Sequence, residues 1–89
     1  MSDSSESLLQ FPCRFPIKAM GLAEEGFDDL VVAIVRQHAP DLQEGAVVTR
    51  PSKGGKWLSV TVTIRATSRA QLDAIYQALS DHEKVVMAL

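Results

Sequence analysis

The chain has 89 residues, of which 46% are hydrophobic and 22% are charged, and its formal net charge is -2. This length suits one domain, and the slight negative charge argues against general nucleic-acid binding. The single cysteine excludes an internal disulfide and a paired-cysteine metal or redox motif, so we expect a cytoplasmic protein without a metal or cofactor. No apolar run reaches the roughly 20 residues that a membrane-spanning helix needs, and the N-terminus lacks the pattern of a signal peptide.

The N-terminal segment separates into a polar tail and the start of a domain. Residues 1–7 are acidic and rich in serine, which predicts a disordered tail. One domain is then expected over residues 8–89. Pro12 and Pro16 block a helix and predict an extended lead-in to the first strand.

A strand followed by a helix is predicted next. Residues 15–21 read as a strand because side chains of alternating character lie along them, and Gly21 suits the turn that follows. The helix is predicted over residues 24–40 and is stopped by Pro40. Its apolar stripe has helical spacing, and its first turns are expected to hold four acids. The stripe is Phe27, Leu30, Val31, Ile34, Val35 and His38, and the acids are Glu24, Glu25, Asp28 and Asp29.

The middle of the chain has the pattern of a β-hairpin. Residues 46–52 predict a short strand, and Pro51 confines it to a sheet edge because proline cannot donate to a ladder. Gly54 and Gly55 favour a two-residue turn, with a longer loop as the alternative. Residues 57–67 alternate strictly between apolar and polar side chains and predict the strongest strand, with one buried face.

A second helix and a last strand complete the pattern. The helix is predicted over residues 68–82, with Ser68 and Gln71 at the spacing of a capping box. Residues 84–89 predict the final strand. The order βαββαβ, with right-handed crossovers, predicts an α+β ferredoxin-like two-layer sandwich. Its four-stranded antiparallel sheet should have the order 4-1-3-2, with both helices on one face.

The hairpin is the first candidate site, because it concentrates positive charge. No Asp or Glu occurs from Gly45 to Leu72. Charged residues at a hairpin tip often serve only to keep an edge strand from aggregating. The functional alternative is a patch for an anion or an acidic partner, supported by backbone N–H groups of the turn. That patch comprises Arg50, Lys53, Lys56 and Trp57.

The last strand is the second candidate, as a surface for protein contacts. In the predicted order the strand over residues 83–89 lies at an edge of the sheet. Its sequence is apolar on both faces, so part of it should lie exposed beside Met20. An exposed apolar face next to an open edge favours a protein partner or a homodimer.

Several functions of this fold require residues that the chain lacks. Base stacking on RNA requires aromatic side chains on the open face of the third strand, and only Trp57 is available there, so nucleic-acid binding is not expected. The first loop has neither the cysteine pair of a metal-transfer domain nor the arginine of an acyl-phosphate hydrolase. Cys13 with His38 or His82 would be the only Cys–His combination, and a lone cysteine is usually inert. No catalytic residue is therefore predicted.

Five segments together resemble the YbeD-like family of small bacterial proteins. They are FPCRFPIKAMG, the RQHAP end of the first helix, RPSKGGKWLSVTVTI, IYQAL and the terminal VVMAL. The resemblance implies a ferredoxin-like βαββαβ domain similar in architecture to ACT domains, which bind amino acids and regulate metabolic enzymes.

By this resemblance, the ligand loop of an ACT domain corresponds to residues 21–26, with Gly21, Glu24 and Glu25 as candidate contacts. The usual aspartate followed by Pro-Gly is absent from this loop. The function predicted from the sequence is therefore a non-enzymatic interaction or regulatory domain that acts through protein contacts. The alternative is an ACT-like domain that senses a small molecule such as an amino acid.

Overall fold

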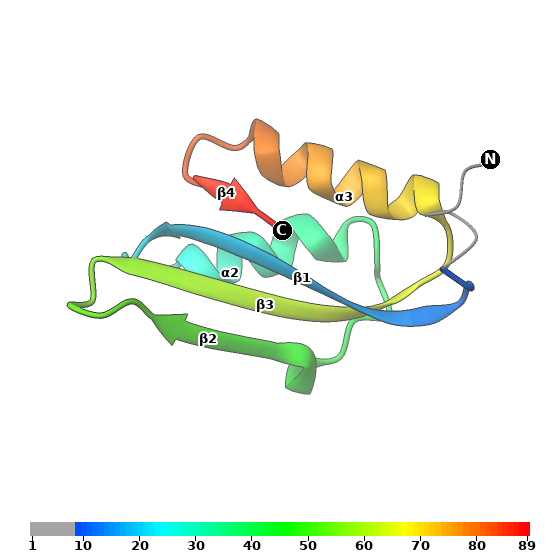
Figure 1. The fold of residues 1–89 in the computed structure, drawn as a ribbon, viewed down its shortest axis with the longest axis horizontal. Helices are drawn as coiled ribbons and strands as arrows, with labels where there is room; N and C mark the ends of the chain where they lie inside the picture. The colour runs from blue at the N-terminus through cyan, green and yellow to red at the C-terminus, as the bar shows by residue number, and fades with distance from the viewer. Residues whose placement is uncertain (1–8) are drawn as a thin grey trace.

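A four-stranded antiparallel sheet is covered on one face by two helices in the computed structural model, which describes residues 9–89 (Figure 1). The strands lie in the order β2-β3-β1-β4, so the predicted ferredoxin-like arrangement is confirmed. The predicted tail, residues 1–7, lies outside the described residues. The elements in chain order are β1 (Cys13–Leu22), α2 (Phe27–Arg36), η1 (Glu44–Ala46), β2 (Val47–Pro51), β3 (Trp57–Ala66), α3 (Arg69–Asp81) and β4 (Met87–Ala88).

The pairing of β1 with β3 forms the centre of the sheet. All ten residues of each strand are paired, from Cys13 opposite Ala66 to Leu22 opposite Trp57. Side chains alternate between the two faces, so one face of this ladder packs on the helices and the other is left open. The buried core on the helix side comprises Ile17, Ala19, Val60, Val62, Ile64 and Ala66 of the sheet, Phe27, Val31, Val35 and Ala39 of α2 and the turn after it, and Leu72, Ile75, Leu79 and Val85 of α3 and the approach to β4.

Strand β1 is longer than residues 15–21, and Pro16 does not interrupt it. Lys18 exchanges two backbone hydrogen bonds with Leu89, at 2.9 and 2.8 Å. Backbone groups two positions along a strand face the same edge. The nitrogen of Pro16 therefore points toward the β4 edge. The last pair on that edge joins Lys18 to Leu89, so no described strand residue lies opposite Pro16 to accept an N–H group.

Helix α2 is shorter than the predicted 24–40 at both ends. Gly26 has a φ of 88°, a left-handed conformation, and the helix begins only at Phe27. Glu24 and Glu25 thus lie before the helix, and the prediction that they occupy its first turns is wrong. Asp28 and Asp29 do lie in the first turn, where the helix dipole favours acids.

The hairpin turn takes the longer of the two predicted forms. The N–H of Ser52 donates to the carbonyl of Trp57 at 2.8 Å, which leaves residues 53–56 as the loop. Gly54 and Gly55 both have positive φ, 92° and 79°. Residues that have a Cβ atom rarely adopt a positive φ, so the loop requires glycine at these two positions.

Helix α3 begins at the predicted Ser68 cap, but the return bond of Gln71 reaches Thr67 instead of Ser68. The Ser68 hydroxyl accepts the N–H of Gln71 at 3.0 Å, and the Gln71 side-chain oxygen accepts the N–H of Thr67 at 2.7 Å. The Gln71 amide also donates to the carbonyl of His38 at 2.8 Å. One side chain thus caps α3 and holds its start against the end of α2.

Strand β4 is shorter than residues 84–89. The N–H of Val85 donates to the carbonyl of His82 at 3.0 Å, which makes a turn of the first residues. Val86 then donates to the carbonyl of Met20 at 2.8 Å, and Met87 lies opposite Met20. The predicted position of the last strand beside Met20 is confirmed.

Gly21 is fixed by packing where β1 meets helix α2 and the approach to β4. It is buried, and a Cβ atom there would collide with the backbone carbonyl of Lys84 and with the ring of Phe27. The ring could turn, but the carbonyl belongs to the backbone beside β4. The sheet and the helix therefore approach each other this closely only because residue 21 has no side chain.

Gly21→Ala is expected to lower the free energy of unfolding by about 1–3 kcal/mol, because the new methyl group overpacks this contact. Urea denaturation of the purified protein measures the change. Gly45→Ala is the matched control, since nothing lies within 4 Å of a Cβ atom at that position and its φ is not positive. Equal stabilities of the two variants would contradict the packing role of Gly21.

Candidate functional site

The open face of the sheet is the surface of the strands that the helices leave uncovered. Because paired residues on neighbouring strands share a face, the register fixes its rows of side chains. From the hairpin end to the far end, the rows are Leu22–Trp57, Met87–Met20–Ser59–Arg50, Leu89–Lys18–Thr61–Val48, Pro16–Thr63 and Arg14–Arg65. Two residues of strand span roughly 6.6 Å, so these five rows extend over roughly 27 Å.

Positive charge is concentrated on this face and on the hairpin tip. Four cationic side chains belong to the rows: Arg14, Lys18, Arg50 and Arg65. Lys53 and Lys56 add two more in the loop between β2 and β3. No strand contains an Asp or a Glu. The sheet layer is therefore cationic without an acid of its own.

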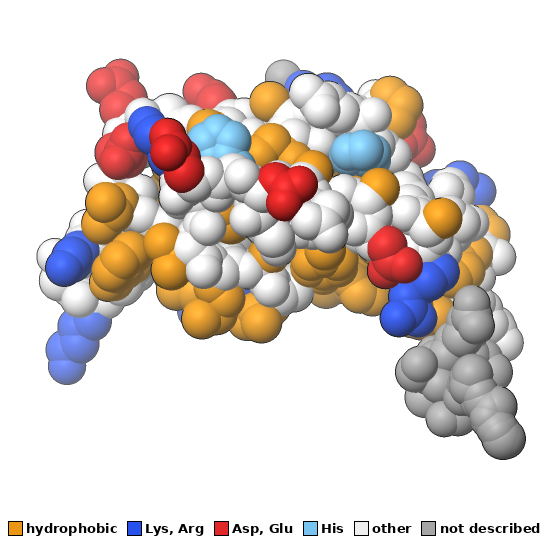
Figure 2. Space-filling view, turned by 90° about the horizontal axis from the view of Figure 1, so that it is seen from above, with side chains coloured by type: hydrophobic (Ala, Val, Ile, Leu, Met, Phe, Trp, Pro, Cys, Tyr) orange, Lys and Arg blue, Asp and Glu red, His pale blue; other side chains and the backbone are white. Residues whose placement is uncertain are grey.

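The acids lie on the other layer of the molecule. Figure 2 shows acidic side chains over the helix layer and hydrophobic side chains along the opposite margin. The acids beyond the tail belong to helices α2 and α3 and to loops: Glu24, Glu25, Asp28, Asp29, Asp41, Glu44, Asp73, Asp81 and Glu83. Although the net charge is only -2, the sheet layer carries positive charge and the helix layer carries negative charge.

Ion pairing preserves this separation. The two ion pairs among residues 9–89 join Arg69 to Asp73 at 3.5 Å and Lys84 to Glu24 at 2.8 Å. Both involve cations of the helix layer and its loops. Among the described side chains, which do not include that of Glu44, the six cations of the sheet and hairpin tip have no acidic partner within 4.0 Å. Their charge is available to an external anion.

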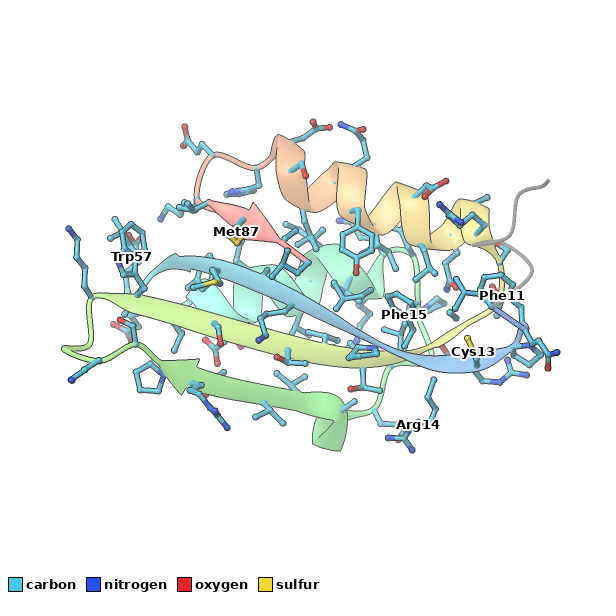
Figure 3. All side chains as sticks on the ribbon, in the orientation of Figure 1. Phe11, Cys13, Arg14, Phe15, Trp57 and Met87 are labelled. Atoms are coloured by element: carbon cyan, nitrogen blue, oxygen red, sulfur yellow. The ribbon has the colours of Figure 1, made fainter. Side chains whose placement is uncertain are left out.

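Apolar side chains cover the hairpin end of the same face. Leu22 and Met87 are 46% and 48% exposed, and Met20 and Trp57 beside them are half-buried. Figure 3 places Trp57 and Met87 toward one end of the sheet and Arg14 toward the other. Half-buried hydroxyl groups of Ser59, Thr61 and Thr63 occupy the middle of β3. The face therefore changes from apolar to cationic along its length.

The predicted hairpin patch is only partly one surface. Arg50 lies on the open face opposite Ser59, and Trp57 lies on that face opposite Leu22. Lys53 and Lys56 are exposed in the loop beyond the sheet. The Lys56 ammonium lies 5.4 Å from the centroid of the Trp57 ring, within the range of a cation–π interaction. The structure therefore joins Arg50 and Trp57 to the open face, while the two lysines extend it at one end.

The predicted ligand loop is partly occupied by contacts within the protein. Gly21 packs beneath Phe27, and Glu24 is bonded to Lys84, while Glu25 is exposed. A hollow of about 260 Å³ lies beside this loop, lined by Leu22, Glu24, Phe27, Glu83, Lys84 and Val86. The Glu24 hydrogen bond, followed by its negative charge, raises the pKa of Lys84, which keeps the ammonium charged beside the hollow.

The groups considered for chemistry lie apart from this face. The ring nitrogen Nδ1 of His82 accepts the N–H of Lys84 at 3.1 Å, and His38 contributes its carbonyl to Gln71. Cys13 has no hydrogen bond to either histidine within residues 9–89. In the same range, no three His, Cys, Asp or Glu side chains form a group that could hold a metal ion. No helix of the described chain is long and apolar enough to cross a membrane.

The sequence reasoning missed Arg14, Lys18 and Arg65 as members of the site. The strand alternation already assigns Lys18 and Met20 to one face of β1, and Arg65 to the polar face of β3. Which strand faces which, and at what register, decides that Arg14 lies opposite Arg65. That information comes from the pairing of segments far apart in the chain.

The fold and the site together define a ferredoxin-like domain with a bare cationic sheet face, and the sequence assigns it to a family. Residues 6–89 match the family described as "Protein of unknown function (DUF493)". A UPF0250 protein of Nitrosomonas europaea is 50% identical over 97% of this chain and 99% of its own. A UPF0250 protein of Chromobacterium violaceum is 51% identical over the whole of both chains. The chain belongs to this DUF493/UPF0250 family, which confirms the YbeD-like resemblance.

A solved structure supports the architecture. The solution structure of protein HP0495 from H. pylori superposes with a TM-score of 0.69, covering 91% of this chain and 85% of that one. Its sequence identity is 17%, so the likeness concerns the fold alone. The family description assigns no activity.

The Lys84–Glu24 pair provides a test of the charge layout near the first loop. Glu24→Gln should return the pKa of Lys84 toward its ordinary value of 10.5, because a neutral amide replaces the carboxylate that bonds the ammonium. The bond stabilises the fold below pH 10.5, and this contribution is lost as the pH rises through the raised pKa. Both side chains are about half exposed, so stability at neutral pH should change little.

An NMR titration of the Lys84 side chain measures this shift. Glu83→Gln is the matched control, since Glu83 raises the pKa of Lys84 only as a minor, longer-range charge. A larger fall of the Lys84 pKa in Glu83→Gln than in Glu24→Gln would contradict the bond as its main cause.

Proposed function

We propose that this protein is a non-enzymatic interaction or regulatory domain whose open sheet face binds an acidic surface of a protein partner. The observation that carries the proposal is the separation of charge between the two layers. Four strand cations share one face with no acid among them, and none has an ionic partner among the described side chains, which exclude that of Glu44. Such a face attracts a negative surface.

The other side chains of the face favour a protein over a nucleic acid. Met20, Leu22 and Met87 give it an adaptable apolar end, which suits the core of a protein interface. Stacking of bases would require aromatic rings along β3, and the row of Ser59, Thr61 and Thr63 provides only hydroxyl groups. A partner with an apolar contact flanked by carboxylates fits both ends of the face.

The edge at residues 83–89 extends this surface to one side. Leu89 is 64% exposed and Met87 is 48% exposed, and Met87 belongs to both the edge strand and the open face. A second copy of the chain carries an acidic surface in its own helix layer, so self-association is one form that this contact can take. Sedimentation of the purified protein at high micromolar concentration distinguishes a homodimer from a contact with another protein.

Charge reversal on the face tests the proposal. Lys18→Glu and Arg50→Glu should each weaken capture of the partner at least about tenfold, because a carboxylate then faces the partner's carboxylates. The measurement is quantitative affinity capture from the native cell with the tagged protein, repeated at raised salt. Capture by the unaltered protein should fall as salt screens the attraction.

The matched control is Arg36→Glu, which changes the net charge equally but lies on helix α2 in the acidic layer. Proteins that bind the unaltered chain and Arg36→Glu, and are lost from Lys18→Glu and Arg50→Glu, are partners of the open face. A parallel arm with Lys53→Glu and Lys56→Glu tests the hairpin tip separately. Identical protein sets with all variants would rule out the proposed surface.

The hollow beside the first loop favours one second candidate, a small-molecule sensor of ACT type. It lies between the end of β1 and the approach to β4, where Glu24 could receive an ammonium group if its bond to Lys84 were exchanged. Its volume of about 260 Å³ is at the lower limit of ligand pockets. The bond already made by Glu24 is the reason that this function ranks second.

Calorimetry against a panel of amino acids tests this candidate. A ligand whose ammonium group replaces Lys84 at Glu24 should bind with measurable heat, and Glu24→Gln should abolish that heat. Glu25→Gln is the control, because Glu25 lies in the same loop and does not line the hollow. The absence of heat for every amino acid would reject the sensor while leaving the proposed partner face untouched.

A further inference from the structure

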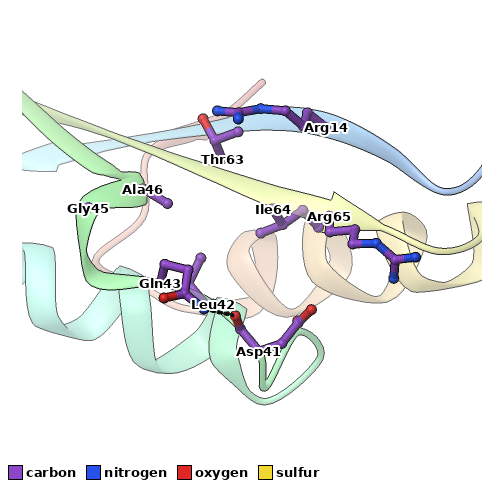
Figure 4. A pocket seen from close by; sticks show the side chains of 9 residues that line it. All are labelled: Arg14, Asp41, Leu42, Gln43, Gly45, Ala46, Thr63, Ile64 and Arg65. Atoms are coloured by element: carbon purple, nitrogen blue, oxygen red, sulfur yellow. Dashed lines mark hydrogen bonds between the residues drawn. The ribbon is translucent and has the colours of Figure 1, made fainter.

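A hollow of about 410 Å³ opens at the end of the sheet farthest from the hairpin tip. Strand β2 begins at Val47, opposite Val62, so the last four residues of β3 have no β2 residue beside them. The segment at residues 41–46 curves past this gap and encloses the hollow instead of filling it (Figure 4). Its volume is in the range that small-molecule sites occupy.

Two arginines are paired across the strands at this hollow. Arg14 lies directly opposite Arg65, and both line it. The bonds of Lys18 to Leu89 place Arg14 and Arg65 in a non-hydrogen-bonded pair, the closer of the two pair types in an antiparallel ladder. Like charges directly opposite each other destabilise a sheet. In Figure 4 the Arg14 side chain extends over Thr63, while that of Arg65 turns the other way.

Two hydrogen-bond donors besides the guanidinium groups lie at the hollow, the Arg65 N–H and the Thr63 hydroxyl. Alternation along β3 directs the backbone N–H of Arg65 away from β1, toward the gap that β2 does not cover. The Thr63 hydroxyl lies on the lining and makes no side-chain hydrogen bond within residues 9–89. Guanidinium groups, a hydroxyl and a backbone N–H are the donors that bind phosphate and carboxylate oxygens.

Asp41 is an acid on the described lining, and it does not neutralise the arginines. No ion pair joins Asp41 to Arg14 or Arg65 in the described part of the chain. The lining residues given for this hollow therefore include two guanidinium groups and one carboxylate. We infer that this hollow binds a small anionic ligand, whose phosphate or carboxylate group is held by Arg14, Arg65, Thr63 and the Arg65 N–H. The site shares Arg14 and Arg65 with the protein-partner face proposed above, but it takes a small ligand at one end of that face.

Amide NMR spectra of the full chain, titrated with inorganic phosphate or with acetate at constant ionic strength, test the inference. Saturable shifts should be confined to the amides of Gly45, Ala46, Thr63 and Arg65. Gly54 and Gly55 provide an internal control, since they lie beside Lys53 and Lys56 at the opposite end. The stronger of the two arms identifies the oxyanion as a phosphate or a carboxylate.

Variants separate a built site from general attraction to positive charge. Arg14→Gln and Arg65→Gln should each weaken binding at least about tenfold, because each removes a charged, bidentate hydrogen-bond donor. The double variant Lys53→Gln, Lys56→Gln removes more charge and should leave the affinity unchanged. Asp41→Asn should tighten binding, because it removes an opposing charge from the described lining.

Both arginines are exposed, so their replacement should preserve the fold, and the dispersion of the same spectra verifies this. Shifts that do not saturate, or that are equal at Gly54 and Gly55, would overturn the inference. So would unchanged affinity in a folded Arg65→Gln variant. None of these outcomes would affect capture of a protein partner through Lys18 and Arg50, so failure of the two proposals can be told apart.

Discussion

The full pairing of β1 with β3 is the constraint on which both faces of the molecule depend. Side chains alternate along each strand, so a slip of one residue would move Ile17, Ala19 and their partners from the core to solvent. The helices can be buried against only one register. That same register then places Arg14 opposite Arg65 and Lys18 opposite Thr61 on the other side. The chemistry of the open face is therefore fixed by the packing of the core, although none of its residues belongs to that core.

Charge follows from the same alternation. An arginine on the helix side of β1 or β3 would be a buried, unpaired charge, which costs several kcal/mol, so strand cations can lie only on the open face. The acids lie in the helices and loops, where Asp28 and Asp29 meet the positive end of the α2 dipole. The strand cations thus lie on the open face, and the acids lie in helices and loops, two of them at the positive end of a helix dipole. The combined result is a molecule whose two faces carry opposite sign while its net charge stays near zero.

The sequence predicts what depends on local pattern and misses what depends on distant neighbours. The buried face of β3 and the Ser68–Gln71 cap could be predicted, because alternation and capping involve residues close together in the chain. The strand order followed from the order of the elements and the handedness of crossovers. The predicted start of α2 at residue 24 is wrong. The left-handed conformation of Gly26 prevents the helix from including Glu24 and Glu25, although acids are favourable in a first turn. The role of Gly21 depends on Phe27 and the distant Lys84, and the opposition of Arg14 to Arg65 depends on the register of two separate strands. Neither the role of Gly21 nor the pairing of Arg14 with Arg65 can be inferred from a short segment of the sequence.

The two ends of the open face are coupled by their common charge. A phosphate or carboxylate in the hollow would relieve the repulsion between Arg14 and Arg65, and so would favour the last pairs of the β1–β3 ladder. It would also reduce the positive potential that reaches Lys18, about two rows away along β1. An acidic partner on the face would therefore bind less tightly when the hollow is occupied. By reciprocity of linkage the partner would weaken the small anion to the same degree. A ligand site and a docking face that share one potential, on a domain without evident catalytic groups, would let a metabolite regulate a protein contact without any movement of the backbone.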